Sequence, residues 1–532
     1  MTIEQTNAQD CDQAPIHCLP DEILEAIFLI NTVYSELIEQ GNEKHPYDPH
    51  STTLATTQVC QRWRAVALDY PVIWSRIIDY EKHSPLWIET LLARSGSALI
   101  DVIGPVRLFN HPRGEPVLQS IFQRITYLKT VSLHIHRDLW ESTCHSFLGH
   151  PAPNLEFLDL VISCPFPDYL YPNPLFADEA PCLRRLSLHS CLIDFSSSVL
   201  SNLTELTVMH VIPPAVIFAS ARSHWLEVLP NVAGWLRILK NMPALRFLSL
   251  WDAIPHFTGH ESEPLPVLDL PHLDLLMLNT RFYLGISLID HLNIPPLCGI
   301  AFQAYPSYDR STEGLDSHKL LSFLSKQLTH WSQDCSDRNL QAETNSDGWI
   351  QFRNSIHIGK VSLYSKDPTL SLDLTFNHLE HSFAFFNQFL ELYSSTFSTT
   401  TTLDLRVDQG TAIANGSFPA FPTFRSSSFT NVKTLNLERE SPLYLLPLFQ
   451  HSSLPGHPLF PALQSLHLIW TEMDDEEGAM CRVFVAFLQS RVEAGLPLRE
   501  IKMIGGCISK QTAEILSRIG NLRVSLDSIE KY

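Results

Sequence analysis

The sequence is poor in positive charge for its length, with 37 Lys and Arg residues against 57 Asp and Glu among 532 residues. The resulting formal net charge of −20 argues against a protein that binds the phosphate backbone of nucleic acids, because such binding needs clustered cationic side chains. It suits a protein whose partners are neutral or basic. We therefore expect no nucleic acid among the partners.

Long apolar runs are also missing, since none approaches the ~18 uninterrupted residues that a membrane-spanning helix requires. The first residues, MTIEQTNAQDCDQ, are polar and lack the pattern of a signal peptide. The eleven cysteines are scattered and odd in number, which favours reduced thiols over a disulfide framework. We expect a cytoplasmic or nuclear protein that has no membrane partner.

Motifs of common catalytic and metal sites are absent as well. The sequence has no phosphate-binding loop, no Gly-x-Ser-x-Gly elbow, no His-Glu-x-x-His and no two cysteines separated by two residues. His134 and His136 form a His-x-His pair, but no third ligand is visible nearby. We expect no catalytic residue, no cofactor and no metal, with an unrecognised enzyme site in residues 285–430 as an alternative.

Residues 19–28, LPDEILEAIF, have the pattern of a short amphipathic helix. Pro20 suits the first turn, acidic residues follow where the helix dipole favours them, and apolar residues recur on one face. A second helix is predicted over residues 52–70, TTLATTQVCQRWRAVALDY, followed by a short turn at residues 71–74. Residues 29–53 between the helices contain glycine and prolines and are predicted to be mostly loop.

The order of these motifs resembles the F-box family: Leu-Pro-x-Glu-Ile-Leu-x-x-Ile-Phe, then Val-Cys-x-x-Trp-Arg, then Pro-x-x-Trp, within residues 19–75. In that family a three-helix module binds a Skp-type adaptor, which links it to a cullin and a RING subunit. The family joins its first two helices by a shorter segment than residues 29–53. The resemblance implies that the matching positions are divided between the core of the module and the adaptor contact: Leu19, Pro20, Ile23, Leu24, Ile27, Phe28, Val59, Cys60 and Trp63.

Residues 84–95, SPLWIETLLARS, predict a further helix with Ser84 as N-cap, Pro85 in the first position and Gly96 as C-cap. Residues 98–103 alternate like a strand. We expect four parts: a disordered N-terminus at 1–15, an F-box at 16–80 with an inserted loop at 29–53, a linker helix and first repeat strand at 81–110, and a leucine-rich-repeat-like domain at 111–532.

The remainder of the chain repeats the phrase Leu-x-x-Leu-x-Leu, often with a proline two positions before it. Most intervals between neighbouring instances fit the ~20–29 residues of a leucine-rich repeat. The phrase resembles the irregular, long leucine-rich repeats found behind many F-box modules. Each repeat would supply one strand whose leucines point into the core. The nine instances occupy residues 128–133, 155–160, 183–188, 203–208, 245–250, 273–278, 432–437, 463–468 and 498–503.

The expected fold class is therefore α/β, an N-terminal three-helix F-box followed by an irregular leucine-rich-repeat solenoid. Residues 285–430 are expected to hold degenerate repeats with insertions, because their periodicity is weaker. Helices are predicted there at 317–331 and 383–395, and strands at 361–366, 370–376 and 402–407. Towards the end of the chain, helices are predicted at 479–495 and 511–519.

Positions between the repeat leucines face away from the core, so they are the natural place for a target to bind. The candidates are Phe157, Asp159, Arg185, His189, Phe247 and Trp251. The resemblance implies a substrate-recognition subunit of a Skp–cullin–F-box ubiquitin ligase, with an unidentified protein target. The alternative is a non-catalytic interaction scaffold without a ubiquitin-ligase role.

Overall fold

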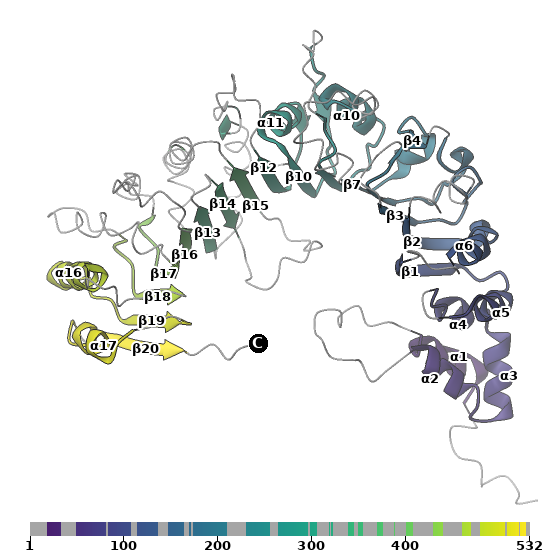
Figure 1. Cartoon of the computed structure of the whole chain (residues 1–532), viewed down its shortest axis with the longest axis horizontal. Helices are drawn as coiled ribbons and strands as arrows, with labels where there is room; N and C mark the ends of the chain where they lie inside the picture. The colour runs from purple at the N-terminus through teal and green to yellow at the C-terminus, as the bar shows by residue number, and fades with distance from the viewer. Residues whose placement is uncertain are drawn as a thin grey trace, which may run out of the picture. The chain divides into compact units, whose positions relative to one another are not determined.

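The computed structural model of the chain describes a mixed α/β fold with ten α-helices in the described residues and sheets of mostly parallel strands (Figure 1). The α/β class is confirmed. Two compact units, residues 1–205 and 206–532, are described separately below. The described residues are 19–32, 49–80, 83–107, 114–136, 147–163, 170–171, 174–209, 230–255, 264–295, 298–305, 319, 321–322, 339–344, 349–354, 370–375, 388, 401–407, 429–439, 460–469, 479–505, 508–520 and 522–527. The disorder predicted for residues 1–15 lies outside them.

The first unit begins with helices and continues into a parallel sheet. Its sheet has the strand order β1-β2-β3-β5, and β7 (Glu205–Met209) begins at its last residue. A separate two-stranded sheet pairs β4 (Leu170–Tyr171) with β6 (Leu192–Ile193). The other elements are α1 (Asp21–Ile30), α2 (Pro49–Thr56), α3 (Gln61–Asp69), α4 (Pro71–Arg76), α5 (Pro85–Ser95), α6 (Gly114–Phe122), β1 (Ile100–Arg107), β2 (Leu128–His136), β3 (Phe157–Ser163) and β5 (Arg185–His189).

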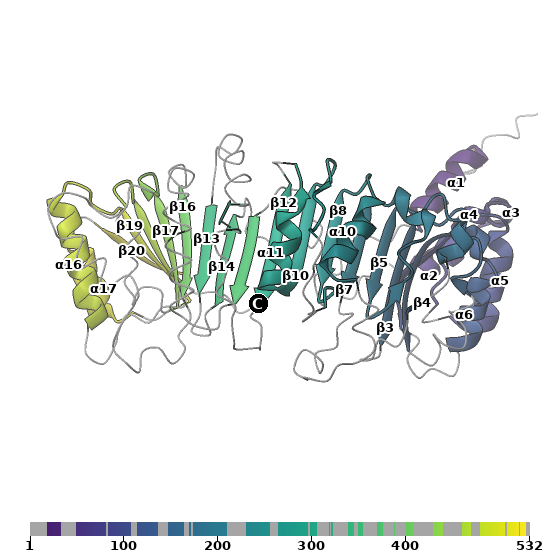
Figure 2. The same ribbon diagram turned by 90° about the horizontal axis from the view of Figure 1, so that it is seen from above.

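The second unit is a longer sheet with the order β8-β10-β12-β15-β14-β13-β16-β17-β18-β19-β20. Helices α10 and α11 lie on one face of strands β8 to β12, and α16 and α17 flank β18 to β20 (Figures 1 and 2). The helices are α10 (Val232–Lys240), α11 (Phe282–Asp290), α16 (Ala479–Glu493) and α17 (Lys510–Ser517). The strands are β8 (Phe247–Trp251), β9 (Leu268–Asp269), β10 (Leu275–Arg281), β11 (Leu292–Asn293), β12 (Gly299–Tyr305), β13 (Asn339–Thr344), β14 (Trp349–Asn354), β15 (Leu370–Thr375), β16 (Thr402–Val407), β17 (Thr434–Arg439), β18 (Ser465–Ile469), β19 (Glu500–Ile504) and β20 (Arg523–Asp527).

A recurring turn precedes seven of the nine leucine phrases. The first residue of the phrase donates its N–H to the carbonyl three residues earlier, as Leu155 does to Ala152 at 3.2 Å. Proline occupies the second position of this turn in five phrases, where its fixed φ suits the geometry. The same turn precedes the phrases that begin at Leu183, Leu203, Leu245, Leu273, Val432 and Leu463.

Successive phrases are joined into sheets by a second recurring hydrogen bond, from a residue after the turn to the preceding phrase. Arg184 donates its N–H to the Glu156 carbonyl at 2.9 Å, and Gln464 donates to the Lys433 carbonyl at 2.8 Å. The second and third leucine positions of each phrase are buried, while the residues between them are more exposed. The strands predicted at all nine phrases are confirmed, as are the helices at 479–495 and 511–519.

The predicted helix over residues 52–70 is wrong as a single element. It is broken between α2 and α3 by Cys60, whose backbone is extended with φ −157° and ψ 171°. The Sγ atom of Cys60 accepts a hydrogen bond from the Trp63 N–H at 3.4 Å. Cys60 is therefore the N-cap of a new helix, a position that a side-chain acceptor stabilises.

Side-chain donors form hydrogen bonds with backbone carbonyls at the end of α2. The hydroxyls of Thr56 and Thr57 donate to the carbonyls of Thr53 and Leu54 at 2.6 and 2.7 Å. Arg64 Nε donates to the Thr57 carbonyl at 3.1 Å. The Thr53 carbonyl also accepts the Thr57 N–H, as in a helix, but Gln58 and Val59 donate to carbonyls three residues earlier, so the helix tightens and ends.

Both ends of the loop predicted at residues 29–53 are helical, since α1 continues to Ile30 and α2 begins at Pro49. Residues 33–48 lie outside the described residues. The turn predicted at residues 71–74 is the helix α4, with proline in its first turn. The helix predicted at 84–95 is confirmed as α5, with the Ser84 hydroxyl accepting the Trp87 N–H at 3.3 Å.

Within the described parts of residues 285–430, the series of parallel strands is interrupted at β13 and β14. Strands β13 and β14 form an antiparallel pair, and β14 is also antiparallel to β15. The sequence did not predict β12, β13 and β14. The strands predicted at 370–376 and 402–407 are confirmed as β15 and β16. The predicted strand 361–366 and nearly all of the predicted helices 317–331 and 383–395 lie outside the described residues.

Candidate functional site

The N-terminal helices form a small module around an aromatic pair. The rings of Phe28 and Trp63 meet edge to face with centroids 5.4 Å apart, which joins α1 to α3. Leu24 and Phe28 have no exposed surface, and Trp63 retains 7%. Trp74 Nε1 donates to the Ala67 carbonyl at 2.7 Å and ties α4 to α3. Leu24, Phe28 and Trp63 thus belong to the core of the module.

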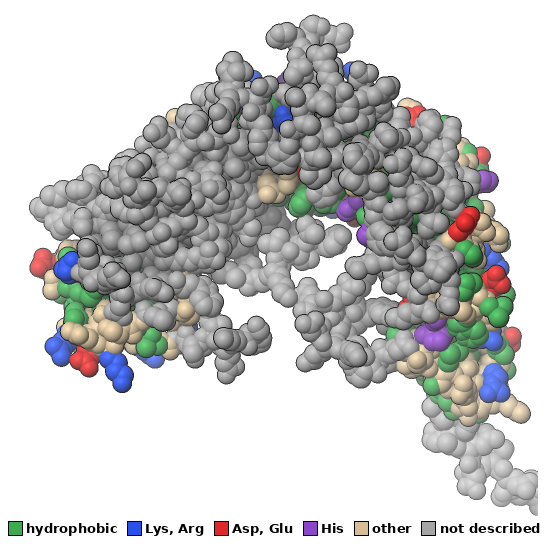
Figure 3. Space-filling model, viewed as in Figure 1, with side chains coloured by type: hydrophobic (Ala, Val, Ile, Leu, Met, Phe, Trp, Pro, Cys, Tyr) green, Lys and Arg blue, Asp and Glu red, His purple; other side chains and the backbone are tan. Residues whose placement is uncertain are grey.

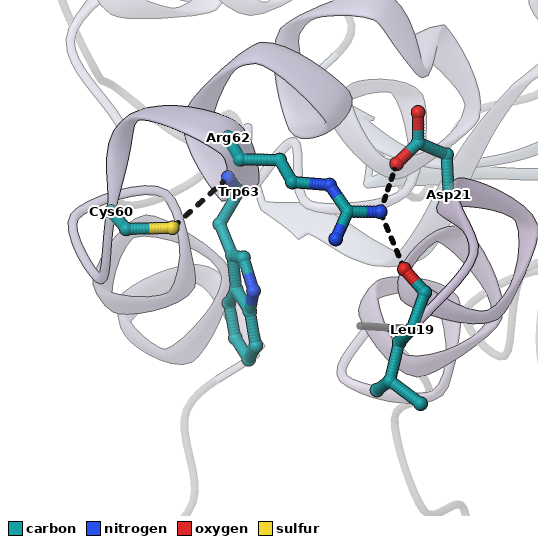
Figure 4. A network of polar contacts seen from close by, with 5 residues as sticks. All are labelled: Leu19, Asp21, Cys60, Arg62 and Trp63. Atoms are coloured by element: carbon teal, nitrogen blue, oxygen red, sulfur yellow. Dashed lines mark hydrogen bonds and ion pairs between the residues drawn. The ribbon is translucent and has the colours of Figure 1, made fainter. Parts of the chain in front are cut away.

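Arg62 links the first turn of α1 to α3 (Figure 4). Its Nη2 atom donates to the Leu19 carbonyl and to Asp21 Oδ1, the latter at 2.6 Å. The Arg62 and Asp21 side chains are 38% and 60% exposed, so the ion pair contributes little to stability. Its structural effect is to fix where α1 begins relative to α3. In the described part of the chain, Trp63 Nε1 is buried and has no hydrogen-bond acceptor.

An apolar stripe remains exposed on this module. Ile23, Ile27 and Ile30 are spaced four and three residues apart and lie on one face of α1. Ile23 is 47% exposed, Ile30 is 69% exposed, and Ile27 is half-buried. Val59, before α3, is 57% exposed. We call Ile23, Ile27, Ile30 and Val59 the apolar stripe, and such exposed apolar groups are typical of a protein-binding surface.

The structure therefore separates the nine positions matched to the F-box pattern. Leu24 and Phe28 are core residues without exposed surface, Trp63 is a core residue with little of it, and Cys60 is a helix cap. The accessible members are Leu19, Pro20, Ile23, Ile27 and Val59. Sequence reasoning missed Ile30, although its spacing of seven from Ile23 is a signal for the same helical face. Hydrophobic and charged groups are interspersed over these helices in Figure 3.

A second candidate surface lies on the face of β3 and β5 that bears the residues between the leucines. Phe157 lies opposite Arg185, and Asp159 lies opposite Ser187. The Arg185 guanidinium stacks over the Phe157 ring at 4.7 Å from its centroid. His189 Nε2 is 3.0 Å from Ser187 Oγ and 3.7 Å from Asp159 Oδ1. Four of the predicted target-binding residues, Phe157, Asp159, Arg185 and His189, thus lie together.

This cluster lacks the geometry of a hydrolytic triad. In a triad the serine and the carboxylate contact different nitrogens of the imidazole, so that one proton moves while the other nitrogen is held. Here Ser187 and Asp159 both lie near Nε2 of His189. The second carboxylate oxygen of Asp159 accepts the Ser132 hydroxyl at 2.8 Å. The arrangement suits a polar binding surface.

The thiol beneath this surface is protected. Cys191 is buried, and burial together with the Asp159 carboxylate raises the pKa of its thiol to about 12. Burial likewise raises the pKa of Cys298 in the second unit to about 12, with a smaller contribution from Asp274. A thiol with such a pKa is not a nucleophile near neutral pH.

The two remaining target-binding candidates lie in the second unit. Phe247 and Trp251 are on β8 and are half-buried on the face that bears the residues between the leucines. Trp251 lies opposite Asn279 of β10, and Phe247 lies opposite Leu275. Asn279 is among the positions between the repeat leucines, but its place opposite Trp251 could not be predicted, because it depends on strand register.

Metal binding has no support in the ranges that the structure describes, where no three His, Cys, Asp or Glu residues come together as ligands. His134 lies on β2, and the side chain of His136 lies outside the described residues. None of the described helices is long and apolar enough to cross a bilayer. No protein-family model and no curated protein matches the chain.

Proposed function

We propose that the chain is the substrate-recognition subunit of a Skp–cullin–F-box ubiquitin ligase. In this proposal the helices α1 to α4 are the F-box, which binds a Skp-type adaptor and through it a cullin. The observation that carries the proposal is the apolar stripe, held in place by the buried core of Leu24, Phe28 and Trp63. An apolar surface on a rigid helical module is what a permanent partner would cover.

The proposal treats the strand-bearing part as an irregular leucine-rich-repeat solenoid that holds the target. The recurring turn and the recurring hydrogen bond between successive phrases support it, because no phrase can bury its leucines alone. The antiparallel pair of β13 and β14 is then an insertion within the series.

Such a subunit needs no catalytic residue of its own. It holds the target close to the ubiquitin-charged enzyme and thereby raises the effective concentration of the target's lysines. The proposed location is the cytoplasm or the nucleus, and the proposed outcome is ubiquitin-dependent degradation of the target.

Binding to a purified Skp-type adaptor tests the proposal, with the full chain immobilised and the adaptor titrated. Ile23→Asp and Val59→Asp each place a charge on the apolar stripe, so both are expected to weaken binding strongly. Leu86→Asp is the matched control, because Leu86 is 75% exposed on α5 and outside the stripe. Its binding should equal that of the unaltered chain.

If the unaltered chain does not bind the adaptor, the ligase role is contradicted, and the non-catalytic interaction scaffold is the alternative that remains. Equal binding by the Ile23 and Leu86 variants would contradict the stripe as the contact.

A further inference from the structure

Strand β20 is the last in the strand order of the second unit's sheet, and within the described residues it pairs with β19 alone (Figure 1). Arg523 donates its N–H to the Arg499 carbonyl, just before β19, at 3.0 Å. Successive residues of a strand direct their backbone groups to opposite edges, so Val524 and Leu526 direct theirs away from β19. The outer edge of β20 therefore offers backbone donors and acceptors to a further strand.

The same end of the sheet exposes apolar side chains that belong to the core face. Val524 and Leu526 lie opposite Ile501 and Met503 of β19, which are 0% and 1% exposed. Residues that pair across two strands share a face of the sheet, so Val524 and Leu526 lie on the core face as well. Leu526 is nevertheless 60% exposed, and Val524 is half-buried. A strand added to β20 would cover this apolar surface.

The sequence of β20, RVSLD, is self-complementary in charge. Arg523, Ser525 and Asp527 occupy its alternate positions, so a basic and an acidic residue flank a serine. Arg523 is exposed, and the Ser525 hydroxyl donates to Glu500 Oε1 at 3.3 Å. Two antiparallel copies of the strand, related by a two-fold axis at Ser525, bring each Arg523 opposite Asp527 of the other copy. Opposite charges at such cross-strand positions stabilise a sheet, and like charges destabilise it.

The backbone of β20 permits this register. An antiparallel pair alternates between residue pairs that exchange hydrogen bonds and residue pairs that do not. With the axis at Ser525, Val524 of one copy lies opposite Leu526 of the other, and both direct their backbone groups to the shared edge. These residues form the hydrogen-bonded pairs. An axis at Val524 or at Leu526 would use the same backbone groups, but it would leave the arginine or the aspartate opposite Ser525.

We propose that two copies of the chain associate through the outer edges of β20, with the strands antiparallel about a two-fold axis at Ser525. The exposed Val524 and Leu526 side chains pack across the axis, and the two Arg523–Asp527 pairs fix the register. This contact uses the same surface on both copies, so it closes at two copies. The inference involves only the second unit and does not rest on the proposed function.

Sedimentation velocity of the full chain at rising protein concentration tests the proposal. One short strand edge lies at the low end of interface sizes, so the copies are expected to separate in nanomolar solution and to pair at higher concentration. The measured mass should rise from one copy to two. A single copy at every concentration would overturn the proposal, and growth beyond two copies would contradict the closed contact.

Charge reversal tests the register. Arg523→Asp alone sets carboxylates opposite each other, and Asp527→Arg alone sets guanidinium groups opposite each other. Each variant should therefore associate at least about tenfold more weakly than the unaltered chain. An equimolar mixture of the two variants has opposite charges at both positions, and it is expected to regain the lost affinity as a heterodimer. Unchanged association by the single variants, or a mixture that stays monomeric, would contradict the pairing.

Lys433→Asp is the matched control for charge reversal. Lys433 is exposed and precedes β17, which has a neighbouring strand on each side. This variant should associate as the unaltered chain does. A loss equal to that of Arg523→Asp would show an effect of net charge and overturn the role of the β20 edge.

A cysteine at the axis identifies the contact directly. The two Ser525 residues form a non-hydrogen-bonded pair, in which Cα atoms are about 4.5 Å apart, a separation that a disulfide can span. Mild oxidation should therefore link two copies of the Ser525→Cys variant, with the linked peptide identified by mass spectrometry. Ser465→Cys is the matched control, because Ser465 is also half-buried but lies on the internal strand β18. Equal linkage through both engineered cysteines would overturn the proposed contact.

Discussion

Two neighbouring residues of α1 should respond in opposite ways to the same kind of substitution. Leu24 has no exposed surface and packs inside the helical module, whereas Ile23 is 47% exposed on the apolar stripe. Leu24→Ala is therefore expected to destabilise the module with little change in its surface. Ile23→Ala is expected to preserve the module and to weaken adaptor binding.

The magnitudes follow from burial. Removing a fully buried leucine side chain to alanine costs about 2–5 kcal/mol, because the lost apolar contact is joined by an incompletely filled cavity. Ile23→Ala removes a side chain that is only partly buried, so it costs only part of the roughly 1.5–3 kcal/mol that burial of a whole apolar side chain contributes. Alanine also stabilises the helix by a few tenths of a kcal/mol, because its helix propensity is higher than that of isoleucine. The net destabilisation by Ile23→Ala is about 0.5 kcal/mol.

Hydrogen exchange on the full chain measures both effects locally, at peptides that cover α1 and α3. Leu24→Ala should speed exchange there by a factor of roughly 30 or more, the equivalent of 2 kcal/mol. Ile23→Ala should change exchange by less than about threefold. Equal acceleration by the two variants would refute the division of α1 into a core face and a binding face.

Three further predictions concern Arg62, Tyr80 and the cysteines. Arg62→Met is expected to lower the module's free energy of unfolding by no more than about 1 kcal/mol, because the ion pair with Asp21 is solvent-exposed. Hydrogen exchange of α1 and α3 measures this change, and a larger loss would contradict the expected value. Tyr80→Phe is expected to raise that free energy by about 1 kcal/mol, since the buried Tyr80 hydroxyl has no hydrogen-bond partner among the described residues. Burial also raises the Tyr80 pKa, so stability should fall as the pH rises above the unfolded value of about 10, and Tyr80→Phe should fall less steeply in chemical unfolding. Native-state alkylation at about pH 8 should spare Cys191 and Cys298, whose pKa values burial raises to about 12, while half-buried Cys60 reacts, as read by mass spectrometry.

Elements set by local chemistry could be predicted from the sequence. The leucine phrases mark strands because a repeat buries the same positions each time, as at Leu158 and Leu160 of β3. The helix α5 was predictable from Ser84 and Gly96, because both caps act within one turn of the helix.

Features that depend on competition or register could not be predicted. The apolar spacing across Cys60 is that of a helix. However, the Leu54 and Thr57 carbonyls accept hydrogen bonds from the Thr57 hydroxyl and from Arg64 Nε. Strand β12 carries no leucine phrase, so its pairing with β10 was invisible. The bond between Asn279 and Gln303 follows only from that pairing.

The ligase role is tested most directly by assembling the full chain with a Skp-type adaptor and a cullin, and weighing the product by mass photometry. We expect a ternary complex of one copy of each, which Ile23→Asp abolishes and Leu86→Asp preserves. A chain that binds the adaptor but excludes the cullin, or binds neither, would contradict the ligase role.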